Sequence, residues 1–193
     1  MLEIKKAGHR ELERYYSLLR MDFDEKELLP KMAIHKAMLR GEQEFLLFCD
    51  SETGMTEGYA LVMCRSAYGY VLLKYFGITP WFREHGLGIE AMRLLNRRYA
   101  DRQGILAELT VFEDQDGQVL RKLRKFFARF GYVQVKCEYS ISGSPVELLC
   151  KPLKNKADTS PVAHRLIRDF YSRCLSARDY EKMNAIRPVE AKK

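Results

Sequence analysis

The chain has 193 residues, of which 47% are hydrophobic, and its formal net charge is +7. This length favours one domain with an appendage, and the apolar content suffices for a buried core. No stretch approaches the roughly 20 apolar residues of a membrane span, and the N-terminal residues lack the apolar run of a signal peptide. We therefore expect a cytoplasmic protein with no membrane partner.

The cysteine and histidine patterns argue against a metal site. The five cysteines include no CxxC pair, and the four histidines show neither HxH nor HxxxH spacing. Four of the cysteines lie in apolar, strand-like runs and are predicted to be buried thiols. The net positive charge suits a polyanionic ligand, either a phosphorylated cofactor or a nucleic acid, without choosing between them.

Hydrophobic periodicity divides the chain up to residue 153 into helical and strand-like segments. In the first half it predicts a strand at 3–7, helices at 12–19 and 31–40, and an antiparallel meander of strands at 44–50, 58–66 and 68–78. In the second half it predicts strands at 105–112, 132–141 and 144–153. It also predicts a helix before the first of these strands, with Ala91, Met92, Leu95 and Tyr99 on its apolar face. A further helix between the strands at 105–112 and 132–141 has Val119, Leu123, Phe126 and Phe130 on its apolar face. The predicted order, βααβββαβαββ, is that of an α/β domain with a mostly antiparallel first half and one βαβ crossover.

Residues 154–193 are predicted to be a basic extension, because they hold +5 of the net charge. Ser160 and Pro161 are typical of a helix start, and apolar residues at helical spacing follow them: Ala163, Leu166, Ile167, Phe170 and Cys174. We expect this helix to pack on the domain or on a second subunit of a homodimer. A nucleic-acid-binding arm is the alternative, but no aromatic interleaving or known binding motif accompanies the basic residues, so nucleic acid is not an expected partner.

Residues 79–95, TPWFREHGLGIEAMRLL, contain a glycine-rich turn directly before a helix. One interpretation is a dinucleotide-binding fingerprint, because Gly86, Gly88 and Ala91 fit GxGxxA and Glu108 lies near the spacing of a ribose-binding acid. In that fold the first glycine directly follows the strand, whereas seven residues intervene here. A second interpretation is a tight strand-to-helix turn that binds nothing.

A third interpretation uses the arginine of this turn as well. The spacing Ile78-x-Pro80-x-x-Arg83-x-x-Gly86-x-Gly88 resembles the acyl-CoA loop of the GNAT family of N-acetyltransferases, whose signature is [RQ]-x-x-G-x-[GA]. Backbone N–H groups in such a turn, together with the positive end of the helix dipole, suit a pyrophosphate.

A second landmark of the same family follows later in the chain. Residues 126–132, FFARFGY, resemble the pattern F-Y-x-x-x-G-F. The resemblance covers roughly residues 2–153 and implies a GNAT-like mixed, centrally split β-sheet flanked by helices. It divides the chain into an acyl-CoA-binding domain at 1–153 and a helical extension at 154–193.

The resemblance also implies a co-substrate, acetyl-CoA or a related acyl-CoA. Its pantetheine is expected along the edge of the strand that ends at Ile78, and Arg124 or Lys125 could meet the adenosine phosphate. The residues expected at the cofactor are Phe76, Gly77, Ile78, Arg83, Glu84, His85, Gly86, Leu87, Gly88 and Phe127.

The implied activity is transfer of an acetyl group to an amine by direct attack in a ternary complex. The family's usual general acid is a tyrosine, but this chain has Phe127 at that position, and the asparagine often found seven residues earlier is Leu120. Where some relatives place a glutamate base, this chain has Leu72. We therefore expect catalysis by positioning and amide electrostatics, without a dedicated protein acid.

Replacement catalytic groups can still be named. Tyr75, Tyr132 or Tyr139 could donate a proton, and Glu113 or Asp114 could accept one through water. Bulk solvent is the alternative proton acceptor.

Two acidic loops lie where this family places its acceptor site. One contains Asp22, Asp24, Glu25 and Glu27, and the other contains Glu113, Asp114 and Asp116. They are either ordinary solvated loops or a negative funnel that gathers a cationic small-molecule or peptide amine. The rival function is an acyl-CoA-binding sensor or interaction module that has lost turnover.

Overall fold

The structure is a computed structural model that describes residues 1–83, 85–111, 117–154 and 158–183. Its strands are β1 (Leu2–Lys6), β2 (Gln43–Asp50), β3 (Thr56–Met63), β4 (Tyr70–Ile78), β5 (Gly104–Thr110), β6 (Val133–Ile141) and β7 (Ser144–Pro152). Its α-helices are α1 (Leu12–Asp22), α2 (Lys31–Leu39), α3 (Leu87–Arg98), α4 (Gln118–Ala128), α5 (Ala163–Cys174) and α6 (Ala177–Lys182). Short 3-10 helices are η1 (His9–Glu11), η2 (Pro80–Phe82) and η3 (Ser160–Val162).

The predicted order βααβββαβαββ is confirmed, and the basic extension adds η3, α5 and α6. The seven strands form one sheet in the order β1-β2-β3-β4-β5-β7-β6. Every neighbouring pair is antiparallel except β4 and β5, which are joined by the α3 crossover and run parallel.

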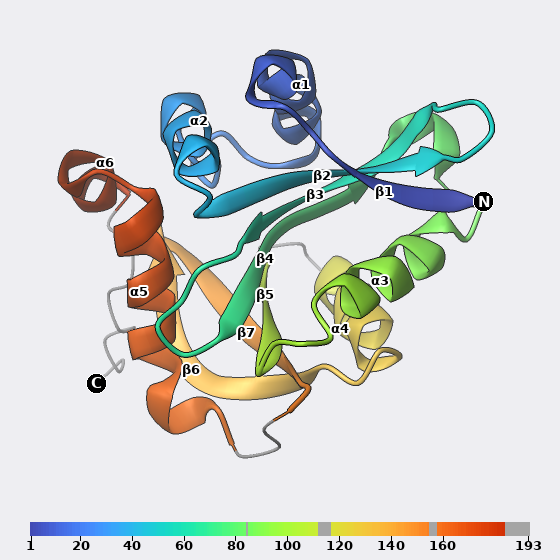
Figure 1. Cartoon of the computed structure of the whole chain (residues 1–193). Helices are drawn as coiled ribbons and strands as arrows, with labels where there is room; N and C mark the ends of the chain where they lie inside the picture. The colour runs from blue at the N-terminus through green and yellow to red at the C-terminus, as the bar shows by residue number, and fades with distance from the viewer. Residues whose placement is uncertain (84, 112–116, 155–157, 184–193) are drawn as a thin grey trace.

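Helices cover both faces of this sheet (Figure 1). The strand β2 shows why: Phe45 and Leu47 belong to the core under α1, α2 and α5, whereas Leu46 and Phe48 belong to the core under α3 and α4. Successive side chains of a strand point to opposite faces, so an uninterrupted apolar run buries both. The result is two hydrophobic layers separated by the sheet.

The helix of the extension packs on the domain itself. Leu166, Ile167, Phe170 and Tyr171 are fully buried, and α5 contacts α2 and β6. The apolar stripe predicted for this segment is therefore confirmed as a packing face. Its hydrophobic residues belong to the same core as those of α1 and α2.

The prediction for the apolar face of α4 was partly wrong. Val119 is 48% exposed, whereas Leu120 and Phe127 are buried and Leu123 and Phe126 are half-buried. Apolar residues occupy more than one stripe of this helix, so their spacing alone could not select the face that meets the sheet. The face that packs is centred on Leu120 and Phe127.

The burial predicted for the cysteines of the apolar runs is confirmed. All five cysteines are buried and unpaired, and burial raises the pKa of Cys64 and of Cys174 to about 12. Within the residues that the structure describes, no helix combines the length and the apolar character required to cross a membrane.

We expect Phe170→Ala to destabilise the protein by about 3–5 kcal/mol, because it empties a fully buried aromatic site. Arg173→Ala on the same helix is the matched control: its exposed ion pair with Asp169 should contribute no more than about 0.5 kcal/mol. Urea unfolding of both variants measures the difference. Equal, small effects would show that α5 is not integral to the core.

Candidate active site

The sheet opens between its two parallel strands. β4 and β5 pair only over Tyr70–Leu73 and Gly104–Ala107, and beyond that point they separate. On its other side β4 pairs with β3, where Leu61 faces Tyr75 and the next residue, Val62, faces Leu73. Lys74 is therefore the extra residue of a β-bulge located where the strands part.

The bulge changes which way the side chains of β4 point. Leu72 and Tyr75 lie in the core under α1, α2 and α5, whereas Leu73 and Phe76 lie in the core under α3 and α4. Lys74 points to the same side as Tyr75, since its ammonium lies 5.5 Å from the Tyr75 ring centroid. Strict alternation would have placed Lys74 and Tyr75 on opposite faces.

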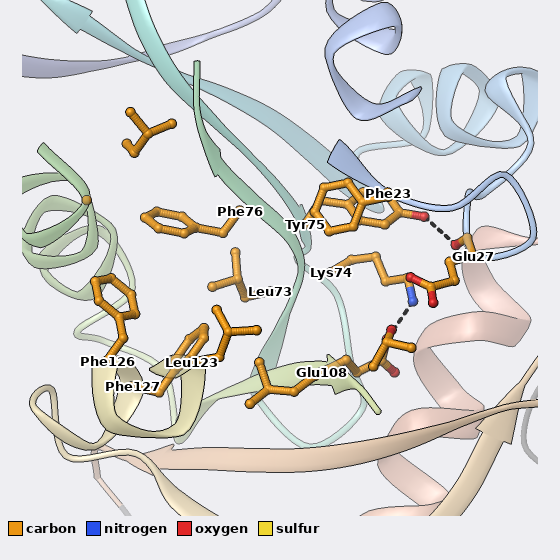
Figure 2. Close-up of a pocket in the computed structure, with 14 residues that line it drawn as sticks. Phe23, Glu27, Leu73, Lys74, Tyr75, Phe76, Glu108, Leu123, Phe126 and Phe127 are labelled. Carbon is orange, nitrogen blue, oxygen red and sulfur yellow. Dashed lines mark hydrogen bonds and ion pairs between the residues drawn. The ribbon is translucent and has the colours of Figure 1, made fainter. Parts of the chain in front are cut away.

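A cavity of about 300 Å³ lies at this opening and is lined from both sides of the sheet (Figure 2). We call its two parts the α1-side chamber and the α4-side chamber. The α1-side chamber is lined by Phe23, Glu27, Lys74, Tyr75, Glu108 and Thr110. The α4-side chamber is lined by Leu73, Phe76, Ile78, Gly88, Leu109, Leu123, Phe126 and Phe127.

The α4-side chamber is apolar and largely aromatic. Phe126 stacks on Phe76 with ring centroids 6.0 Å apart and meets Phe127 edge-on at 5.5 Å. Phe127 also packs against Tyr132 at 5.0 Å and is only 5% exposed. These walls offer no charge and suit an apolar chain or acyl group.

The α1-side chamber contains charges instead. Lys74 donates to Glu108 at 2.7 Å, and both side chains are almost fully buried, with 6% and 3% of their surfaces exposed. The hydroxyl groups of Tyr139 and Tyr171 also donate to Glu108, at 2.9 and 2.7 Å. A buried ion pair needs such additional hydrogen bonds to offset desolvation, and α5 supplies one of them through Tyr171.

Glu27 is a second carboxylate of the α1-side chamber. Burial raises its pKa above the usual glutamate value, while Thr110 and Lys74 act in the opposite direction. Among the residues that the structure describes, no basic group lies within ion-pair distance of it. Glu27 therefore faces the cavity without a direct ion pair, although the Thr110 hydroxyl and the more distant Lys74 charge favour its ionised form.

The glycine-rich turn borders the α4-side chamber. Gly86 has a φ of +74° and precedes α3 directly, so it supplies the left-handed residue that the turn requires. Gly88 lies in the first turn of α3 and does not have a positive φ. The first N–H groups of a helix have no intrahelical acceptor, so this end of α3 presents donors beside the cavity.

Arg83 braces this turn. Its Nε donates to the Ile78 carbonyl at 3.0 Å, and its guanidinium forms an ion pair with Asp22 at the end of α1. Asp22 also accepts a hydrogen bond from Tyr59. His85 is exposed, and its Nδ1 lies 2.8 Å from the Arg83 carbonyl oxygen.

The remaining residues predicted for the site have mixed outcomes. Phe76, Ile78, Gly88 and Phe127 line the cavity. Gly77 and Leu87 lie on either side of the turn, on β4 and at the first residue of α3. Four predicted positions, Glu84, Glu113, Asp114 and Asp116, lie outside the described residues, so their roles stay predictions.

The predicted proton donors are all buried and already hydrogen-bonded. The Tyr75 hydroxyl donates to the Glu27 carbonyl and accepts from the Leu29 amide, both at 2.8 Å, and burial holds its pKa well above the ordinary value. Tyr132 donates to Asn96 at 3.1 Å, and Tyr139 donates to Glu108. Of the three, Tyr75 alone lines the cavity.

Of the acidic residues predicted around the first loop, Glu27 faces the cavity. Asp22 is occupied by Arg83 and Tyr59, and Asp24 accepts from the Lys26 amide in a local turn. Two basic residues were suggested for a phosphate. Arg124 is ion-paired with Glu147, and Lys125 is exposed on α4.

Sequence reasoning missed the buried pair at the centre of the site. Lys74 and Glu108 each follow the last paired residue of their parallel strands, Leu73 and Ala107. The sequence does contain a signal for this pair. Lys74 and Glu108 are each the fifth residue of an otherwise uncharged run, YVLLK and GILAE, and they carry opposite charges. Because the strands are parallel and in this register, the charges meet at the opening.

The sequence matches no protein-family model and no curated protein. Solved structures nevertheless share its fold. A protein from Bacteroides thetaiotaomicron assigned to the GNAT acetyltransferases aligns with a TM-score of 0.67 and 14% identity, covering 88% of this chain and 99% of that one. Spermidine N-acetyltransferase from Vibrio cholerae, in complex with CoA and spermine, aligns with a TM-score of 0.60 and 9% identity, covering 79% and 95%. A protein assigned as a phosphinothricin N-acetyltransferase aligns with a TM-score of 0.58 and 14% identity, covering 80% and 100%.

We expect Gly77→Ala to destabilise the fold by about 1–3 kcal/mol through overpacking. A Cβ at Gly77 would lie 2.6 Å from the Tyr59 ring and 3.0 Å from Asp22, which disturbs the brace of the turn. Gly88→Ala is the control, because a Cβ there meets its nearest atom, on Phe126, at an ordinary 3.7 Å. Thermal unfolding compares the two variants, and equal melting temperatures would contradict the close packing at Gly77.

Proposed function

We propose, on the premise that this chain has the GNAT fold, that it binds an acyl-CoA and transfers the acyl group to an amine. The observation that carries the proposal is the cavity at the separation of β4 and β5, because it joins an apolar chamber beside the turn before α3 to a charged chamber on the opposite side of the sheet. Acyl transfer requires the thioester carbonyl carbon and the amine nitrogen to be held in contact, and such a cavity admits one reactant from each side of the sheet. Acetyl-CoA is the proposed co-substrate.

The turn before α3 supports the placement of the pyrophosphate. Gly86 gives it the left-handed conformation, Arg83 holds it to β4 and α1, and the start of α3 adds backbone donors. The pantetheine would run along β4 beyond Leu73, where none of the described residues pairs with that strand on its β5 side. An extended ligand can use the free backbone groups of such an edge.

The reaction would proceed in one step without a covalent enzyme intermediate. The amine nitrogen attacks the thioester carbonyl carbon, a C–N bond forms and the C–S bond breaks, and CoA leaves as a thiolate. The amine gives up a proton, and Glu27 is the proposed acceptor, because it lines the cavity and has no direct ion-pair partner among the described residues. Phe127 cannot donate a proton, so the thiolate would leave without an acid at that position.

The second candidate function is an acyl-CoA-binding sensor without turnover. The observation in its favour is Phe127 itself. Its ring packs against Phe126 and Tyr132, and it offers no hydroxyl at the position where the family usually has a tyrosine. Release of free CoA from acetyl-CoA in the presence of amines, amino acids and peptides separates the two functions. No release with any acceptor, despite tight cofactor binding, would favour the sensor.

Calorimetry with acetyl-CoA tests the cofactor site, and two substitutions at one position sharpen it. Gly86→Val should weaken binding by about tenfold or more, since a β-branched residue resists positive φ. Gly86→Asn should weaken it less, because asparagine tolerates that conformation and no atom lies within 4 Å of the added Cβ. Absence of binding by the unmodified protein at millimolar ligand would end the proposal.

The pH dependence of kcat/KM tests Glu27. Its pKa is raised mainly by burial, with Asp24 and Glu108 adding to the shift and Thr110 and Lys74 opposing it. Glu27 can accept a proton only when it is ionised. The value of kcat/KM should therefore fall as the pH drops through the raised pKa of Glu27, and this fall should occur at a higher pH than for an ordinary glutamate. Glu27→Gln should remove this acid limb and lower kcat by about 10²–10⁴-fold. An unchanged profile would assign the proton to another group or to solvent.

A further inference from the structure

The charged groups of the α1-side chamber differ in how far their hydrogen-bonding capacity is used. Glu108 accepts from three donors, one each from Lys74, Tyr139 and Tyr171. A carboxylate has about four acceptor positions. Glu108 is therefore nearly saturated and has little left to offer a ligand.

Lys74, in contrast, has hydrogen-bond donors that are not used. A lysine ammonium has three donor hydrogens, and Glu108 takes one of them. The rings of Tyr75 and Tyr171 flank the ammonium, with their centroids 5.5 and 5.4 Å away. These rings stabilise the charge but do not replace hydrogen-bond acceptors. Among the described residues no further acceptor bonds Lys74, which lines the cavity, so two donor hydrogens are available to a ligand.

Glu27 supplies the complementary charge. It lines the same chamber, is buried, and has no cation within ion-pair distance in the described part of the chain. The Thr110 hydroxyl and the Lys74 charge offset the cost of burying this carboxylate only in part, since burial still raises its pKa. A ligand cation in direct contact with Glu27 would offset the rest. Figure 2 shows Glu27 and Lys74 on the same side of β4, across the strand from Phe76, Phe126 and Phe127.

We propose that the acceptor is an amino acid or a closely similar amino-carboxylate, with its amine at Glu27 and its carboxylate at Lys74. This inference rests on the proposed acyl transfer and specifies its substrate class. A polyamine would bring a second cation toward Lys74 and leave its donors unused. The Phe23 and Tyr75 rings, whose centroids are 4.7 Å apart, form an apolar wall that favours an acceptor with an apolar side chain.

The test compares acceptors that differ only in the carboxylate. Phenylalanine, phenethylamine and spermidine are incubated with acetyl-CoA, and rates are compared at equal concentrations of unprotonated amine. One charge-assisted hydrogen bond is worth about 1.5–3 kcal/mol, so kcat/KM for phenylalanine should exceed that for phenethylamine by about 10- to 100-fold. Equal rates for the two, or a preference for spermidine, would overturn the inference and leave the acyltransferase proposal intact.

A double substitution assigns the preference to Lys74. Lys74→Met alone would strand a buried carboxylate, so it is combined with Glu108→Gln, which keeps an oxygen for Tyr139 or Tyr171. The double variant should bring the ratio of kcat/KM for phenylalanine to kcat/KM for phenethylamine close to one. The readout is this ratio, because Lys74 and Glu108 both line the cavity and their loss also changes the absolute rate with either amine. Lys5→Met, which changes an exposed lysine on β1, should keep the preference. A preference that survives in the double variant contradicts the role of Lys74.

A readout without acetyl-CoA separates this inference from the proposed function. Saturation-transfer NMR should detect phenylalanine on the unmodified protein, and phenethylamine should not displace it at equal concentration. If acetyl-CoA does not bind but phenylalanine does, recognition of the amino-carboxylate stands and acyl transfer falls. If neither binds, both fall. If the double variant does not fold, this competition and the acceptor panel on the unmodified protein decide the outcome.

Discussion

The structure depends on the separation of two parallel strands and on the buried ion pair that spans it. After four residue pairs the ladder between β4 and β5 ends, and Lys74 and Glu108 meet across the gap. In a low-dielectric interior such a pair must have its remaining hydrogen bonds satisfied. Tyr139 and Tyr171 meet that requirement, so β4, β5, β6 and α5 have to be positioned together.

The same separation divides the chemistry of the site between the two faces of the sheet. The α4-side chamber is aromatic and uncharged, and the turn before α3 lies at its rim. The α1-side chamber holds two carboxylates and one ammonium. An apolar thioester can thus occupy the α4-side chamber while a charged acceptor occupies the α1-side chamber. The two reactants would come into contact only at the opening of the sheet.

Sequence periodicity predicted the order of elements because most helices bury one apolar face and most strands bury one or both faces, and each case leaves a recognisable spacing of apolar residues. It failed where local geometry departs from the regular repeat. The bulge at Lys74 places Lys74 and Tyr75 on one face, and no alternating pattern contains that information. Tyr171 reaches Glu108 from 63 residues away, and such a contact depends on how α5 docks. The glycine turn was predictable because its conformation is dictated by the residue type at Gly86.

The position of β7 between β5 and β6 constrains the way the chain can fold. Strands β1 to β4 pair mostly with near neighbours in sequence and can assemble early, since short loops cost little entropy to close. β5 has only its brief contact with β4 until residues 144–152 arrive. If the earlier strands assemble during synthesis on the ribosome, the β5 edge would stay exposed until residues 144–152 emerge. Pairing with β7 would then cover an edge prone to aggregation.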